Sequence, residues 1–135
     1  MMQLILTNPT AVAAGGNIIP SLDFNTNTNI LSYNAATGEI TFLQPGIYKV
    51  IANVVFTATD ASLNTIFGFS GSNNANVPGL TASSTTAAAA AAATYSMAKD
   101  VRIGPAAVGQ NARINLRSLT AGTLNNVCII VDKVR

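Results

Sequence analysis

The sequence contains no histidine, no tryptophan and a single cysteine among its 135 residues. Without histidine the chain lacks the commonest general base and a frequent metal ligand, and one cysteine cannot form an internal disulfide. Carboxylates are few and far apart, with no D-x-D spacing of the kind that calcium loops use. They are Asp23, Glu39, Asp60, Asp100 and Asp132. These absences predict no catalytic site, no metal and no cofactor, and they make an enzyme the least favoured function class.

Charge is also scarce, because charged residues make up 9% of the chain and apolar residues 49%. A surface with so few charges favours association over dispersal. The net charge of +2 is uneven, since residues 1–60 carry more acids than bases and residues 61–135 carry the reverse. The basic second half fits solvated outward strand positions or a patch that faces a partner, with Arg113 and Arg117 as the candidate partner-facing residues. Its cations alternate with aliphatic rather than aromatic residues, so nucleic-acid binding is not predicted.

Targeting signals are missing as well. No N-terminal segment combines basic residues, an apolar stretch of signal length and a cleavage site, and no apolar run is long enough to span a bilayer. We therefore expect no membrane association and synthesis in the cytosol. No shift in composition marks a second domain, so residues 1–135 are expected to form one domain.

The clearest positive pattern lies between residues 31 and 57, LSYNAATGEITFLQPGIYKVIANVVFT. Residues 39–43 and 47–58 alternate between apolar and polar positions, which predicts two strands. Pro45 and Gly46 between them predict a turn, because proline fixes φ and glycine tolerates positive φ. In the second strand five alternate residues are expected to face the core: Tyr48, Val50, Ala52, Val54 and Phe56.

The same stretch carries a family resemblance. Tyr33-Asn-x-x-Thr-Gly-x-Ile-Thr, followed by Pro-Gly-x-Tyr48 and a long apolar strand, resembles the signature of the tumour-necrosis-factor and complement globular-head superfamily. Val12-Ala-Ala-Gly-Gly-Asn-Ile18 ahead of it is similar to the heads of bacterial spore-surface glycoproteins and to phage relatives. The resemblance is specific over residues 11–58. It implies an all-β, ten-stranded jelly roll of two sheets that assembles as a homotrimer, and it does not imply an enzyme.

Other runs predict further strands, over residues 3–7, 18–24, 30–33, 63–69, 95–103, 111–119 and 126–134. In 111–119 the residues Ala112, Ile114 and Leu116 are expected inside and the intervening Asn115 in a solvated face. Seven alanines, residues 87–93, leave two alternatives open. Alanine has the highest helix propensity, whereas the alternation that begins at Tyr95 favours an extended strand or loop there.

The last predicted strand is apolar on both faces. Val127, Ile129 and Val131 share one face, while Cys128 and Ile130 occupy the other. A strand with no polar side is covered on both faces, yet only one face of a two-layer sandwich meets the core. In the resembled family the final strand belongs to the sheet that packs against neighbouring subunits. We therefore predict a trimer interface at Val127, Ile129 and Val131, and a buried, unreactive Cys128.

These observations favour a non-enzymatic structural protein. The expected function is that of a trimeric virion surface component, of the phage capsid decoration or head-fibre type, that docks on a symmetric shell formed by a major capsid protein or other virion proteins. The alternative is a receptor- or glycan-binding head of a phage fibre or of a bacterial cell or spore surface. Glycan binding is the weaker expectation, since the chain has no Trp and only three tyrosines to offer as a stacking platform.

Overall fold

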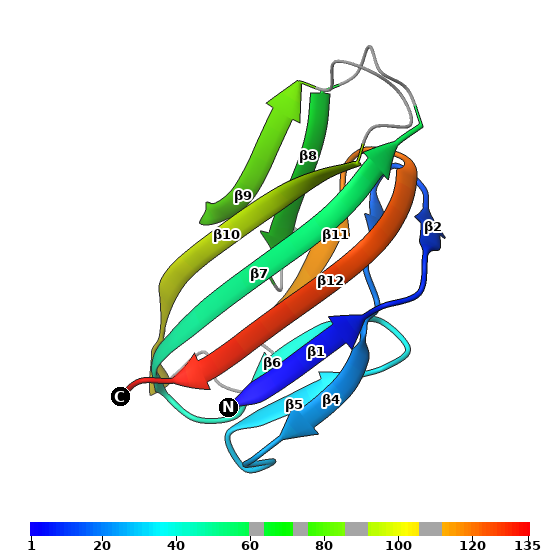
Figure 1. The fold of residues 1–135 in the computed structure, drawn as a ribbon. Helices are drawn as coiled ribbons and strands as arrows, with labels where there is room; N and C mark the ends of the chain where they lie inside the picture. The colour runs from blue at the N-terminus through cyan, green and yellow to red at the C-terminus, as the bar shows by residue number, and fades with distance from the viewer. Residues whose placement is uncertain (60–63, 72–75, 86–91, 106–111) are drawn as a thin grey trace.

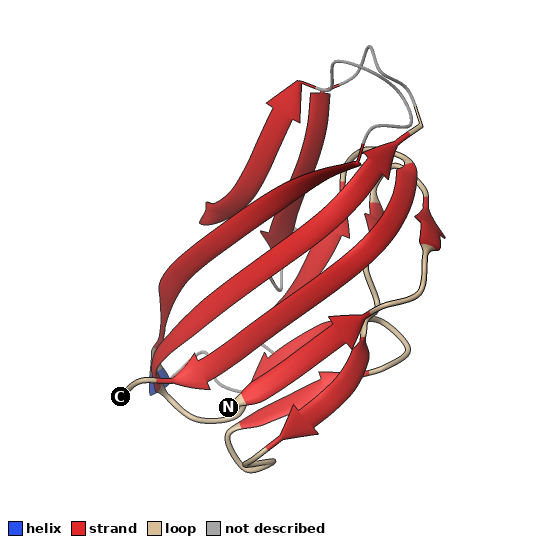
Figure 2. Ribbon diagram, viewed as in Figure 1, coloured by secondary structure: helices blue, strands red, loops and turns tan. Residues whose placement is uncertain are grey.

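The structure is a computed structural model, and it describes residues 1–59, 64–71, 76–85, 92–105 and 112–135. Within these ranges the chain forms twelve strands that pair antiparallel in two sheets. The two sheets face one another as a sandwich, with both chain termini at the same end (Figures 1 and 2). The all-β, two-sheet jelly roll expected from the sequence is confirmed.

The first sheet contains the longest strands. Its order is β10, β7, β12, β1 and β4, and β2 pairs with β12 beside this path. The bounds are β1 Met2–Leu6, β2 Thr10–Val12, β4 Ser21–Asn25, β7 Gly46–Ala58, β10 Ala92–Ile103 and β12 Gly122–Lys133. Figure 1 shows this sheet on the near side of the sandwich, with β7 and β12 at its centre.

The second sheet lies behind the first. Its order is β5, β6, β11, β8 and β9, and the short β3 pairs with β11. The bounds are β3 Gly16–Asn17, β5 Leu31–Asn34, β6 Glu39–Phe42, β8 Asn64–Ser70, β9 Asn76–Thr85 and β11 Arg113–Ser118. Because β11 is flanked by β6, β8 and β3, it is a central strand of this sheet.

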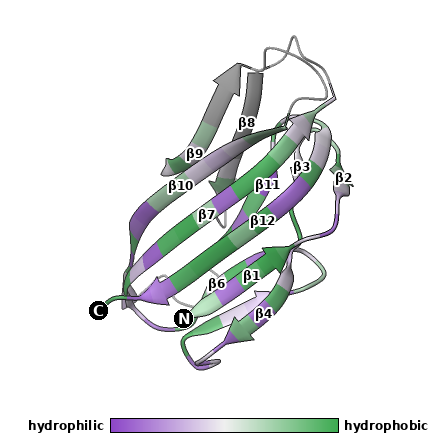
Figure 3. Ribbon diagram, viewed as in Figure 1, coloured by the Kyte–Doolittle hydropathy of each residue, from purple (hydrophilic) through white to green (hydrophobic). Residues whose placement is uncertain are grey.

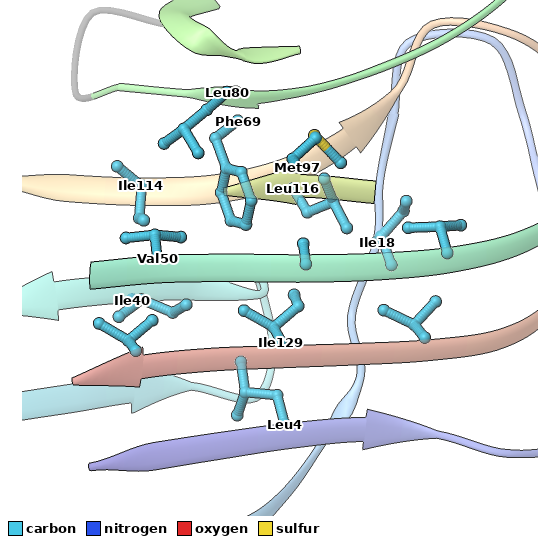
Figure 4. Packing of buried hydrophobic residues seen from close by; sticks show 14 of the residues in the cluster. Leu4, Ile18, Ile40, Val50, Phe69, Leu80, Met97, Ile114, Leu116 and Ile129 are labelled. Atoms are coloured by element: carbon cyan, nitrogen blue, oxygen red, sulfur yellow. The ribbon is translucent and has the colours of Figure 1, made fainter. Parts of the chain in front are cut away.

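The core forms between the facing sides of the two sheets. The five alternate residues predicted to face inward from β7 are all buried: Tyr48, Val50, Ala52, Val54 and Phe56. From the second sheet Ile40, Phe69 and Leu116 pack against them, as Figure 4 shows for labelled members of the cluster. The turn before β7 needs glycine, because a Cβ on Gly46 would lie 2.2 Å from the carbonyl oxygen of Arg135.

Three strands were not predicted from the sequence: the short β2 and β3, and the longer β9. β9 contains Pro78 and Gly79, both of which signal a break, and Gly79 has a φ of +82°. β9 is an edge strand, where proline and glycine interrupt fewer ladder bonds than they would in a central strand. Of the alanine tract, Ala92 and Ala93 belong to β10, while residues 86–91 lie outside the described part. The alternatives for those six residues stay open.

Tyr33 of β5 links the two sheets near the edge of the sandwich. Its hydroxyl donates a hydrogen bond of 2.5 Å to the carbonyl oxygen of Pro20, just before β4. Burial of the ring raises the pKa of Tyr33 to about 12. The neutral hydroxyl is therefore the form that the folded protein favours.

Stability is expected to fall as the pH rises from about 10 towards 12, because the raised pKa of Tyr33 favours folding only while the hydroxyl is protonated. Each pH unit in this window lowers the free energy of unfolding by at most about 1.4 kcal/mol. The partly exposed ring makes the loss smaller. Urea unfolding of the wild type and of Tyr33→Phe through this window measures the effect. The prediction would be wrong if the free energy of unfolding of Tyr33→Phe fell as much as that of the wild type.

Candidate functional site

The outward face of the first sheet is built of side chains aligned across the strands. In one row Ala98 of β10 pairs with Ile51 of β7, and Ile51 pairs with Ile130 of β12. In the next row Cys128 of β12 pairs with Ile5 of β1. Together with Val55 of β7 we call these residues the outer apolar face: Ile5, Ile51, Val55, Ala98, Cys128 and Ile130.

This face points away from the core of its own chain. The alternation of β7 and β12 places Val50 and Val131 inside, so Ile51 and Ile130 point outward, where both are half-buried. Figure 3, which colours the inward and outward residues alike, shows hydrophobic segments of β7, β12 and β1 interrupted by hydrophilic ones. The outward side of an antiparallel sheet that meets water is ordinarily polar. The outer apolar face is therefore a candidate contact surface.

A row of alternating charge borders the outer apolar face. Lys49 of β7 lies between Asp100 of β10 and Asp132 of β12 in the register of the sheet. The amino group of Met1 lies 3.4 Å from a carboxylate oxygen of Asp132 and extends the alternation to a fourth position. These groups are partly or fully exposed. Opposite charges in adjacent strands stabilise the pairing modestly and leave little net charge on the row.

The residues predicted for the trimer interface lie elsewhere, and that assignment is corrected. Val127, Ile129 and Val131 are at most 2% exposed within a single chain, where they pack in the core between the sheets. They pair with the inward residues of β7, for example Val131 with Val50. They have no surface left for a partner, and the outward residues of β12 near them are Cys128 and Ile130.

Cys128 is half-buried rather than buried. Its thiol belongs to the outer apolar face, beside Asn53 of β7 and Ile5 of β1 in the register. The expectation that Cys128 is buried does not hold within a single chain. Its position instead makes Cys128 a probe of whatever covers this face.

Arg113 and Arg117 project from the outward side of β11, but both are held by their own chain. Arg113 forms an ion pair of 2.8 Å with Glu39, and Arg117 donates to the carbonyl oxygen of Gly15 at 2.9 Å. Between them Asn115 is only 7% exposed and donates to Asn17. The face of β11 expected to be solvated is thus largely covered by β6 and by the segment around β3. A partner-facing role for the two arginines stays a proposal that these contacts weaken.

Groups suited to chemistry do not gather in the described residues. No cluster of three or more His, Cys, Asp or Glu side chains there could hold a metal ion. Asp100 and Asp132 flank Lys49, and Glu39 forms an ion pair with Arg113. Neither arrangement pairs two carboxylates for acid and base catalysis.

The three tyrosines offer no open stacking platform. Tyr48 and Tyr95 are buried, and Tyr33 is half-buried with its hydroxyl bonded to Pro20. Burial also raises the pKa of the Tyr48 hydroxyl, while its hydrogen bond to the backbone of Gln44 acts in the opposite direction. Phe24, at 39% exposure on the edge strand β4, is an aromatic ring that does reach solvent. The described surface therefore lacks the tyrosine platform that carbohydrate binding would use.

The described residues contain no helix that is both long and apolar enough to cross a membrane.

Comparisons with known proteins agree with the geometry. No protein-family model and no curated protein matches the chain. Among solved structures, murine APRIL superposes with a TM-score of 0.63 at 14% identity, covering 97% of this chain and 98% of its own. Eiger TNF from S. frugiperda gives 0.66 at 9% identity, covering 99% and 92%. The PRD1 vertex protein P5 gives 0.61 at 14% identity, covering 99% and 96%. Identities this low show the fold alone, and that fold is the tumour-necrosis-factor-like jelly roll.

Proposed function

We propose that this protein is a homotrimeric, non-enzymatic component of a virion surface that docks on a symmetric shell. The observation that carries the proposal is the outer apolar face, which a single chain leaves towards solvent. A protein whose function is assembly needs such a face, whereas an enzyme needs convergent polar groups. The likeness to a vertex protein and to TNF proteins supports a surface head over a catalyst.

The outer apolar face is best covered by further copies of the same chain. Covering Ile51 or Ile130 fully contributes up to about 1.5–3 kcal/mol for each side chain. The alternating charges of Lys49, Asp100, Asp132 and the Met1 amino group sum to zero, so the row that borders the face does not repel a second copy. In a closed ring of three, the face of one chain meets a different surface of the next, so all three faces are covered.

Two observations support placement on a virion. The vertex protein P5 of PRD1 shares the fold over 99% of this chain. A chain with only 9% charged residues suits permanent attachment to a partner better than free diffusion. A receptor-binding head remains the runner-up because APRIL and Eiger TNF share the same fold. The buried tyrosines argue against a head that binds glycans.

The molar mass in solution tests the assembly. Light scattering at micromolar protein is expected to give three times the chain mass of 13.8 kDa. A mass equal to one chain would reject the trimer.

Retention on particles tests the placement. Virus particles purified from the organism that encodes the protein are expected to carry it after gradient centrifugation. Because exposed ion pairs weaken as salt rises, washing the particles over a salt series shows whether charge or apolar contact holds it. Absence of the protein from particles at all salt concentrations would reject the virion role and favour the receptor-binding head.

A further inference from the structure

A cleft of about 390 Å³ lies at the end of the first sheet where the chain termini meet. β7 begins there, while β10 and β12 end. The residues around the cleft are Pro45, Gly46, Ile47, Arg102, Ile103, Gly104, Pro105 and Arg135. Ile103 is buried and Ile47 half-buried, so the cleft is an apolar surface, and the exposed residues Arg102 and Arg135 border it.

The register places the two arginines on either side of Ile47. Arg102 of β10 pairs with Ile47 across one side of β7. On the other side the amides of Val134 and Arg135 both donate to the carbonyl oxygen of Ile47, and the amide of Ile47 donates to Arg135. Two residues that follow β12 are therefore held beside a single residue of β7. Two strand spacings separate the arginine backbones by about 10 Å.

Both guanidinium groups are available for a ligand. Arg102 and Arg135 are exposed, and no hydrogen bond or ion pair joins either side chain to another described residue. This contrasts with Arg113 and Arg117, whose guanidinium groups are bonded within the chain. The opposite end of the sheet carries no charge in β2 or in residues 53–58, 92–98 and 122–127.

We propose that this cleft binds an extended acidic segment of another protein, with carboxylates at alternate positions. Guanidinium groups bind carboxylates through paired, charge-assisted hydrogen bonds. In an extended segment alternate side chains share one face and stand about 7 Å apart, within reach of two flexible arginines about 10 Å apart at the backbone. The residue between them points away, and aliphatic parts of the segment lie on Ile47 and Ile103. The inference rests on the cleft alone and holds whether or not the protein belongs to a virion.

Fluorescence anisotropy on the intact protein tests this with a labelled peptide, Gly-Ser-Glu-Val-Glu-Ser-Gly. Two control peptides replace both glutamates by glutamine, or place the glutamates next to each other so that they point to opposite sides. We expect the alternating glutamate peptide to bind on the order of tenfold more tightly than either control, because each lost charged hydrogen bond weakens binding by about that factor. High salt should weaken binding.

Variants of the protein locate the site. Arg102→Gln and Arg135→Gln are each expected to weaken binding on the order of tenfold. Both side chains are exposed, so thermal unfolding should be unchanged. Arg113→Gln removes the same charge from the other sheet and should leave binding as in the wild type.

Three results would overturn the proposal. The first is no binding at millimolar peptide. The second is an equal loss of binding in Arg113→Gln, which would indicate attraction to the whole charge of the protein. The third is tighter binding of a sulphated oligosaccharide than of the peptide, which would assign the cleft to a different class of ligand.

Discussion

Replacing Phe56 by alanine is expected to destabilise the protein by about 3–5 kcal/mol. Phe56 is 1% exposed and lies in β7, the strand on which both β10 and β12 pair. Its ring lies against the backbone of Gly122, where an added Cβ would be 2.4 Å from the ring carbon Cζ. Truncation therefore leaves a cavity bounded by backbone that cannot collapse easily. Urea unfolding at fixed protein concentration measures the change.

Lys49→Ala is the matched control for this prediction. Lys49 lies in the same strand but on the opposite face, where it is exposed. Its removal should change the free energy of unfolding by well under about 1 kcal/mol. Similar losses in the two variants would mean that the faces of β7 are exchanged, since a shift by one residue moves every side chain to the other side of the sheet.

The sequence predicted β7 well because its polar and apolar residues alternate without ambiguity. It failed at β12 for the opposite reason. Val127, Ile129 and Val131 are as apolar as Cys128 and Ile130, so alternation identifies two faces but not which one is inside. The pairing of Val131 with Val50 decides this, and that contact joins residues far apart in the chain. A pattern read locally contains no information about such a pairing.

The environment of β11 was mispredicted because it also depends on distant contacts. Its alternation is correct, and Ile114 and Leu116 are buried as expected. The other side is covered by residues about 100 positions away, since Arg117 contacts Gly15 and Asn115 contacts Asn17. A strand with polar residues on one side is ordinarily read as half-solvated. Here hydrogen bonds satisfy the polar groups within the chain instead.

The sequence did not predict the cleft between Arg102 and Arg135, for a further reason. The two arginines belong to different strands, and only the register of β10 and β12 against Ile47 brings them to one place. Their only local signal is a position near turn or terminal residues, such as Gly104 and Pro105. The alternation of residues 111–119 instead favoured Arg113 and Arg117, because it places both on the outward face of one predicted strand.

Ile130→Lys is expected to convert the proposed trimer into monomers. Ile130 is at the centre of the outer apolar face, paired with Ile51 on one side and Gln3 on the other. The substitution removes up to about 1.5–3 kcal/mol of apolar burial from each chain, less the part that is already buried within the chain. It also places an unpaired charge in the contact, which costs more than the lost burial. Light scattering at micromolar protein should report the mass of one chain, and Ile51→Lys should behave in the same way.

Ser32→Lys provides the control, because it adds the same charge at an exposed position of β5 on the other sheet. It should remain trimeric, and circular dichroism should show that all three variants keep the β fold. Cys128, the only cysteine, gives a second readout. Because its thiol lies on the outer apolar face, a maleimide should modify it slowly in the wild type and rapidly in the Ile130→Lys monomer. If Ile130→Lys stayed trimeric with Cys128 still protected, the contact would lie elsewhere. The edge strand β4, where Leu22 and Phe24 are exposed, would then be the next surface to substitute.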